Sequence, residues 1–270
     1  MSILYGFVRV ADNYVDSIPQ KRQEFLEFKA KTIRCLNGER VDDDIITSMV
    51  ELCRRKGINE DFLLSFLASM EMDMKKSIYI TINETIDYMY GSAEVIGLMM
   101  SRIMDMDPDS LHYARLLGRT MQYINFIRDL DEDLKMKRQY LPVDDMKTFG
   151  LDSLDYEHVK GRRKEFISFM RFEIDRYREW ISVAREGFGL IPSDCRVPIM
   201  TATDMYLWTA RVIYKNPFIV YQKKIKPIKI RIFMSLIKNK IISRRTCRVI
   251  INENSFRSME EEFLSIKRNF

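Results

Sequence analysis

The segment Gly118-Arg-Thr-Met-Gln-Tyr-Ile-Asn-Phe-Ile-Arg-Asp-Leu-Asp-Glu-Asp133 decides how this chain is interpreted. Residues three and four positions apart share one face of a helix, so a single stripe contains Gly118, Gln122, Asn125, Asp129 and Asp133. Most neighbouring positions are apolar, which predicts a helix that packs on several sides around a polar seam. Carboxylates one turn apart lie about 6 Å apart along the axis, a separation that a cation or metal-bound water can bridge.

A second acidic pair lies near the start of the chain. Asp12 and Asp16 are also four residues apart, and Arg9 precedes them by about one turn. A single acidic pair is most often a solvated face whose carboxylates pair with basic neighbours such as Lys135 or Arg138. Two such pairs, each with an Arg nearby, instead predict a site in which carboxylates hold Mg²⁺, the metal bridges phosphate oxygens, and Arg binds the remaining oxygens.

The composition favours an all-α protein. Only 10 Gly and 7 Pro occur in 270 residues, while helix-forming residues dominate. The 4 Cys are widely separated, which is typical of reduced thiols in a cytosolic protein, and 2 His make a His-based zinc site a poor explanation. No secretory signal and no apolar run of about 18 residues is evident. We therefore expect a globular cytoplasmic protein.

Apolar periodicity predicts one helical domain over 1–250, followed by a polar tail or helix over 251–270. Apolar residues nearly encircle several predicted helices, and 18 Met supply adaptable packing, so the bundle suits an interior cavity for a flexible alkyl ligand as well as a solid core. The main expected elements are a helix over 82–104, a helix from Pro108 that carries the acidic seam, a loop over 138–153, and helices over 155–187, 195–215 and 217–243.

Small residues interrupt the predicted helix over 82–104. Gly inside a helix costs about 1 kcal/mol relative to Ala, so Gly91 and Gly97 indicate close approach of either another helix or a ligand chain. Tyr88 lies one turn before Ser92 and on the same side. Its ring either faces a carbocation, an attraction of roughly 0.5–2 kcal/mol when desolvated, or belongs to an ordinary buried Tyr that bonds a carbonyl.

Taken together, these segments resemble the squalene/phytoene synthases, which join two isoprenoid diphosphates head to head. The resemblance runs from Tyr5 to about Lys240, and its specific parts are 5–16, 88–99 and 117–133 with the continuation Arg138-Gln-Tyr-Leu-Pro142. It implies a single-domain bundle of the isoprenoid synthase type with a central cavity. The last motif and Tyr-Gly-Ser-Ala-Glu-Val-Ile-Gly look closer to phytoene synthases than to the reductive squalene enzymes.

The resemblance also implies roles for individual residues. The implied metal ligands are Asp12, Asp16, Asn125, Asp129 and Asp133, with Mg²⁺ or Mn²⁺ as the ion, and the four Asp count with Tyr88 as catalytic. The implied diphosphate-binding residues are Arg9, Gln122, Asn125, Arg128 and Arg138. The implied substrate-pocket residues are Tyr5, Ser92, Ile96, Ala114 and Tyr206. Asn13 departs from the family pattern, in which an additional Asp is common at this position.

The implied reaction is condensation of two geranylgeranyl diphosphates to phytoene through a cyclopropyl diphosphate, with release of diphosphate and without a nicotinamide. Two alternatives stay open: a squalene or dehydrosqualene synthase acting on farnesyl diphosphate, and a non-catalytic assembly or binding protein with this fold. Family members usually carry some tens of residues before the first acidic helix, whereas only Met1 to Leu4 precede Tyr5 here. We expect either a start upstream or an open, poorly shielded site whose activity is low or absent.

The region 223–248 contains ten Lys or Arg and no acidic residue, interleaved with Ile, Phe and Leu. A basic amphipathic helix of this kind can lie on an anionic membrane surface, here the inner face of the membrane. The alternative is the last helix of the bundle with a solvated outer face. Nucleic acid is not an expected partner, because no recognised binding motif accompanies the charge.

Overall fold

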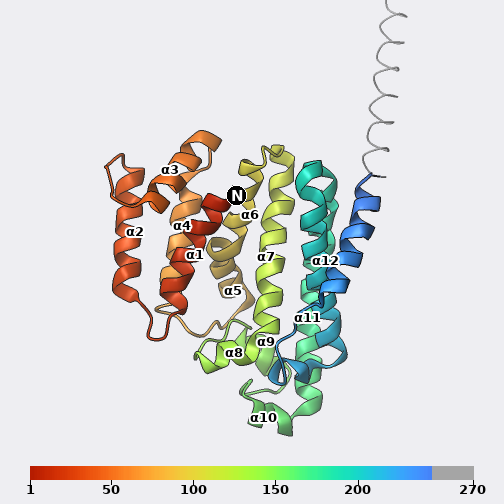
Figure 1. The fold of residues 1–270 in the computed structure, drawn as a ribbon. Helices are drawn as coiled ribbons and strands as arrows, with labels where there is room; N and C mark the ends of the chain where they lie inside the picture. The colour runs from red at the N-terminus through yellow and green to blue at the C-terminus, as the bar shows by residue number, and fades with distance from the viewer. Residues whose placement is uncertain (245–270) are drawn as a thin grey trace, which may run out of the picture.

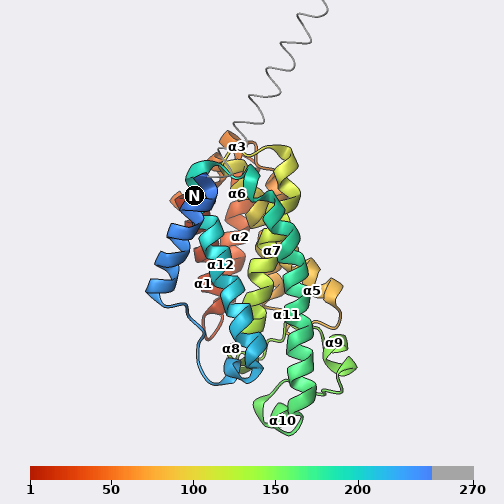
Figure 2. The ribbon, with the colours of Figure 1, turned by 90° about the vertical axis from the view of Figure 1, so that its right-hand side faces the viewer.

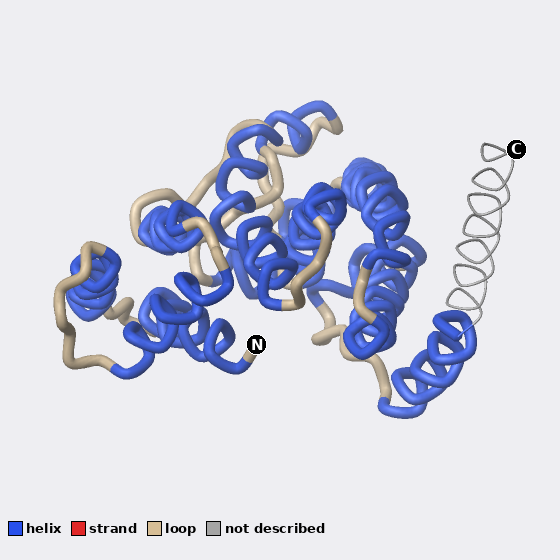
Figure 3. The backbone as a smooth tube through the Cα atoms, turned by 90° about the horizontal axis from the view of Figure 1, so that it is seen from above, coloured by secondary structure: helices blue, strands red, loops and turns tan. Residues whose placement is uncertain are grey.

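The computed structural model describes residues 1–244, which fold into a bundle of α-helices (Figure 1). Across this described part there is no strand, only one isolated bridge between Ile78 and Gln139, and the tube view shows helices joined by loops (Figure 3). The all-α prediction is therefore confirmed. No helix in this range has the length and apolar character needed to cross a membrane. The predicted tail over 251–270 lies outside the described residues.

The first four helices form one side of the bundle (Figure 1). Their shared core contains Phe7, Phe25 and Phe66, which are at most 1% exposed. Local signals set the ends of the third helix: the Asp43 side chain accepts from two backbone N–H groups, and Gly57 ends the helix with φ 57°. The bounds are α1 Ser2–Asp16, α2 Arg22–Leu36, α3 Asp44–Lys56 and α4 Glu60–Met72.

The helix predicted over 82–104 is divided. It consists of α5 Ile82–Met89, a π-helical segment Tyr90–Glu94 and α6 Val95–Ile103. The fully buried Glu94 accepts hydrogen bonds from Arg115 and Arg119 of α7, which tie the π-helical segment to its neighbour. Such segments are rare and often occur at functional sites, and periodicity alone does not reveal them.

Close helix contacts explain the small residues. A Cβ at Gly97 would lie 2.2 Å from the carbonyl oxygen of Ala114, and a Cβ at Gly118 would lie 2.4 Å from that of Ala93. Both contacts join the α5–α6 unit to α7, Leu111–Arg128. A Cβ at Gly91 would lie 2.2 Å from the carbonyl oxygen of Ser65 in α4. At Gly91 and Gly97, the structure therefore supports approach of a neighbouring helix over approach of a ligand chain.

The remaining helices complete the other side of the bundle, where α11 and α12 pack beside α7 (Figures 1 and 2). The predicted loop over 138–153 is wrong in part, because it contains a short helix that begins directly after Pro142. The bounds are α8 Leu130–Lys135, α9 Val143–Thr148, α10 Tyr156–Gly161, α11 Arg163–Glu186 and α12 Ser193–Lys215.

The single helix predicted over 217–243 is also wrong. A 3-10 turn, Pro217–Tyr221, is followed by non-helical chain over 224–228 and by a helix over 229–244. Pro227 accounts for the break, because proline disfavours a helical conformation at the preceding residue and lacks the N–H of a helix interior. The last described helix lies along the outside of α12 (Figure 2).

Candidate active site

A cavity of about 610 Å³ runs through the bundle beside α7. This volume lies in the range of small-molecule sites, roughly 300–1,000 Å³. One face of α7 supplies much of the wall, with residues spaced three and four apart as expected for a single helical stripe. These residues are Ala114, Leu117, Gly118, Met121, Gln122 and Asn125.

One end of the cavity is acidic. Asp12 and Asp16 come from the last turn of α1, whereas Asp129 occupies the break between α7 and α8 and Asp133 lies one turn further on. All four line the same cavity. The continuous helix expected through this seam is interrupted at Asp129, whose backbone has φ −96° and ψ 15°.

The carboxylates of the two pairs influence one another across the acidic end. Desolvation and the neighbouring Asp16 raise the pKa of Asp12 to about 6. Desolvation raises the pKa of Asp133 to about 8, with further contributions from Asp129 on its own side and from Asp16 on the opposite side. Crowded carboxylates of this kind favour a bound cation or a proton.

Arginines already neutralise part of this charge. Arg138 donates from Nη1 to Asp16 Oδ1 at 2.9 Å and is only 8% exposed. Arg128 binds Asp129 with two hydrogen bonds, Nε to Oδ1 at 2.8 Å and Nη2 to Oδ2 at 2.5 Å. Both guanidinium groups therefore lie at the acidic end, where they could also donate hydrogen bonds to the oxygens of a phosphate group.

A third carboxylate position, which the sequence reasoning missed, adjoins the acidic end. Asp73 follows α4 and lines the cavity, and desolvation raises its pKa to about 6. Its carboxylate accepts hydrogen bonds from the hydroxyl of Tyr88 at 2.5 Å and from the hydroxyl of Tyr140 at 2.9 Å. No second acid at helical spacing marks Asp73 in the sequence, so no local signal distinguishes it from a surface residue.

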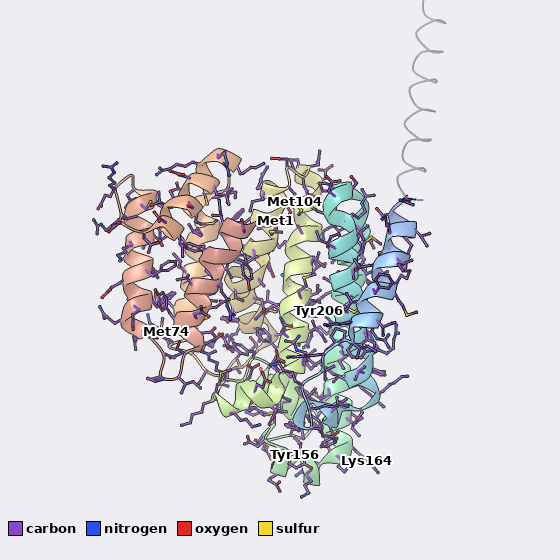
Figure 4. The ribbon with its side chains drawn as sticks, viewed as in Figure 1. Met1, Met74, Met104, Tyr156, Lys164 and Tyr206 are labelled. Atoms are coloured by element: carbon purple, nitrogen blue, oxygen red, sulfur yellow. The ribbon has the colours of Figure 1, made fainter. Side chains whose placement is uncertain are left out.

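The other end of the cavity is mostly apolar. Ser92, Ile96 and Ala114 lie along its middle, and several methionines and aromatic rings lie beyond them. Figure 4 places Met104 near the start of α7, far from α8 and the acidic end. The lining residues of this apolar end are Met100, Met104, Met106, Tyr113 and Phe188.

Comparison with known proteins agrees with this arrangement. The model of a family described as squalene/phytoene synthase matches residues 1–232. This chain belongs to the squalene/phytoene synthase family. The family is one of prenyltransferases, and the resemblance inferred from the sequence motifs is confirmed.

Relatives and solved structures place the chain further within the squalene/phytoene synthases. It is 28% identical over 238 residues to a 15-cis-phytoene synthase of Synechocystis sp., covering 82% of this chain and 70% of that protein. A phytoene synthase of Arthrospira platensis is 26% identical over 237 residues, with 82% and 76% covered. A dehydrosqualene synthase crystallised with a ligand has a TM-score of 0.72 at 19% identity, covering 90% of this chain and 86% of that chain. A squalene synthase from Alicyclobacillus acidocaldarius has a TM-score of 0.69 at 18% identity, with 80% and 82% covered.

Most residues that the family resemblance assigns to the site converge on the cavity. Arg128 does not line the cavity, but it donates a hydrogen bond to Asp129, which does. Arg9 is exposed, and its positive charge lowers the pKa of Asp12. Those that line the cavity are Asp12, Asp16, Tyr88, Ser92, Ile96, Ala114, Gln122, Asn125, Asp129, Asp133 and Arg138.

Two predicted pocket residues do not line the cavity in this structure. Tyr5 lies one turn before the lining residue Val8, but no element covers it and it is 70% exposed. Tyr206 lies on α12 (Figure 4), where it packs half-buried against the core. Their assignment to the substrate pocket stays a prediction.

The donor atoms fit a hard divalent cation, although they do not form a closed cage. Asn125 Oδ1 is buried without a hydrogen-bond partner at the cavity wall. Among residues 1–244, no group of three or more His, Cys, Asp or Glu side chains is arranged to hold one ion. Mg²⁺ commonly uses one or two carboxylates together with water and substrate phosphate oxygens. The site therefore suits a cation that keeps water or other oxygen ligands besides the protein side chains.

Proposed function

We propose that this chain condenses two prenyl diphosphates head to head, with geranylgeranyl diphosphate as substrate and phytoene as product. The observation that carries the proposal is one cavity with two facing acidic pairs at one end and an apolar lining at the other. This division matches an amphiphilic substrate, because the diphosphate needs cations and arginines whereas the prenyl chain needs apolar walls.

Residues of the acidic end would bind and orient the diphosphates. When bound, Mg²⁺ or Mn²⁺ would supply Lewis-acid neutralisation of the leaving diphosphate, held by Asp12, Asp16, Asn125, Asp129 and Asp133. Arg128 and Arg138 would release their carboxylates and bind diphosphate oxygens. Arg9 and Gln122 would complete the oxygen contacts.

The apolar walls would protect the reactive intermediates. Loss of diphosphate from one substrate leaves an allylic cation, which the double bond of the second substrate attacks. Loss of a proton as the three-membered ring closes then gives a cyclopropyl diphosphate. A second loss of diphosphate, rearrangement and loss of one proton then give the central double bond, so no hydride donor is consumed. Exclusion of water by the cavity prevents capture of these cations. Tyr88 and Phe126 would present ring faces to them.

The length of the cavity accommodates a long prenyl chain. The wall beside α7 extends from Ser110 to Asp129, which corresponds to about 28 Å at 1.5 Å per residue. The sixteen-carbon main chain of geranylgeranyl diphosphate spans roughly 20 Å with bonds of about 1.5 Å. The phytoene synthases among the relatives favour this substrate, while the shorter farnesyl diphosphate remains the alternative.

A product assay tests the proposal. The purified protein is incubated with labelled geranylgeranyl or farnesyl diphosphate and Mg²⁺, without nicotinamide, and a C40 hydrocarbon is the expected product. Asp129→Asn should abolish most turnover, whereas Asp61→Asn, the same change at an exposed position of α4, should not. A C30 product would favour the farnesyl alternative, and binding without turnover would favour a non-catalytic family member.

We further propose that the protein contacts an anionic membrane surface through 223–248, of which the structure describes residues up to 244. The helix over 229–244 turns polar side chains inward: Asn239 is 1% exposed and donates to Asp204 at 3.0 Å. Its outer face instead presents Phe233, Met234 and Ile237, which are 61%, 65% and 48% exposed. Exposed apolar groups beside Lys and Arg fit the boundary of an anionic bilayer.

Vesicle flotation tests this contact. We expect binding to phosphatidylserine-containing vesicles at low salt, weaker binding at high salt, and loss of binding in Phe233→Ser/Met234→Ser. Ile33→Ser, at a 37% exposed position of α2, is the matched control. Absence of binding to anionic vesicles at low salt would reject the surface model.

A further inference from the structure

One carboxylate joins three separate segments at the cavity wall. Asp73 directly follows α4, Tyr88 belongs to α5, and Tyr140 lies between α8 and α9. The Tyr88 hydroxyl donates to Asp73 Oδ2 at 2.5 Å, and the Tyr140 hydroxyl donates to Asp73 Oδ1 at 2.9 Å. Both carboxylate oxygens are therefore engaged by phenols, and all three residues line the cavity.

The two phenols belong to a stack of aromatic rings. Tyr140 stacks on Phe126 with ring centroids 4.2 Å apart at 12°, and on Tyr88 at 5.2 Å and 27°. Tyr79 packs against both tyrosines, stacked on Tyr140 at 5.6 Å and 27° and tilted by 54° toward Tyr88 at 5.4 Å. Since both hydroxyls converge on one carboxylate, the hydrogen bonds fix the rotation of each ring within the stack.

The charge of this carboxylate also changes what the rings offer. A phenol that donates to a carboxylate is polarised toward its oxygen, and hydrogen bonds strengthen one another in a site of low dielectric. An electron-rich ring attracts a cation more strongly.

We propose that Asp73 is a positioning residue that fixes Tyr88 and Tyr140 at the cavity wall next to the acidic end, so that positive charge in the cavity is stabilised beside Tyr88. The inference rests on the proposed condensation, because the cations are those of that reaction. Asp73 acts here through the two tyrosines and is assigned no contact with the metal.

A double-mutant comparison tests whether Asp73 acts through Tyr88. Asp73→Asn keeps the shape of the side chain but removes its charge and one hydrogen-bond acceptor. We expect kcat to fall about 3- to 30-fold with little change in KM. This range corresponds to a weakened, desolvated cation–π contact. In the Tyr88→Phe background, Asp73→Asn should lower kcat by a further factor of less than about 3, because the effects of substitutions at interacting residues are not additive. Asp73→Glu should restore part of the rate, and Asp61→Asn is the matched control.

Binding of a stable cation provides a readout that does not need turnover. We expect Asp73→Asn to weaken binding of a prenyl ammonium analogue about 3- to 30-fold, while binding of a neutral prenyl alcohol stays unchanged. Unchanged ammonium binding, or independent effects of Asp73→Asn and Tyr88→Phe on both measurements, would overturn the inference. If the unmodified protein makes no hydrocarbon yet binds the ammonium in an Asp73-dependent manner, the proposed function fails and the role of Asp73 stands.

Discussion

Replacing Asp133 by Asn should stabilise the metal-free protein while removing a ligand from the proposed metal site. Desolvation and neighbouring carboxylates raise the pKa of Asp133 from 3.8 to about 8. A carboxyl with a higher pKa in the folded state binds its proton more tightly there, so its contribution to stability is lost as pH rises toward 8. Asp133→Asn removes this titration, and the variant should exceed the parent in stability at pH 8.

The structure bounds the size of the effect. At about 1.36 kcal/mol per pKa unit, the change from 3.8 to about 8 corresponds to at most roughly 6 kcal/mol. Water in the cavity and movement of the nearby Arg138 reduce this penalty, so we expect about 1–2 kcal/mol. For a protein of this size 1 kcal/mol shifts Tm by about 2–4 °C, which gives a rise of roughly 2–8 °C.

Thermal unfolding at pH 6 and pH 8, each with EDTA or with Mg²⁺, measures this effect. The parent should lose Tm between pH 6 and pH 8 in EDTA and regain it with Mg²⁺, because a cation binds the ionised carboxylates. Asp133→Asn should show a smaller pH slope and a smaller gain from Mg²⁺, with Asp61→Asn as control. A variant less stable than its parent at pH 8 in EDTA, or one with an unchanged pH slope, would refute the reasoning.

Three further outcomes are expected. Mg²⁺ affinity should increase from pH 6 to pH 9, because Asp12 with a pKa of about 6 and Asp133 with a pKa of about 8 must lose their protons; a flat calorimetric profile would contradict this. Gly118→Ala should cost about 1–3 kcal/mol in urea unfolding, since its Cβ would lie 2.4 Å from a carbonyl oxygen of the neighbouring helix. Gly6→Ala, whose Cβ meets nothing within 4 Å, is the control and should not destabilise α1. Asp43→Ala should cost about 1 kcal/mol through loss of the α3 cap, and an unchanged denaturation midpoint would disprove that role.

Features that depend on residues close together in the sequence were predictable from the sequence. The Asp43 cap and the Gly57 terminus of α3 follow from side-chain and backbone preferences at single positions. The acidic seam followed from helical spacing, and the family resemblance followed from motifs that retain that spacing. The failed prediction over 217–243 also has a local cause, since Pro227 lies inside the apolar pattern that suggested one helix.

Other features depend on contacts between distant segments. The π-helical segment is accompanied by hydrogen bonds from α7 to Glu94, and the break at Asp129 turns α8 away from the line of α7. Asp73 becomes distinctive only when Tyr88 and Tyr140 meet its two oxygens. None of these arrangements has a periodic signature, because each is decided by what packs beside the helix.

The sequence by itself determined that this chain is helical, that it carries two acidic pairs with their members four residues apart, and which family it belongs to, because these properties follow from residue type and spacing along the chain. The tertiary structure alone decided that both pairs face one cavity, that Tyr5 and Tyr206 lie outside it, and that Asp73 holds two tyrosines at its wall. Such facts depend on how helices approach one another, and that approach is fixed by close packing between residues far apart in the chain.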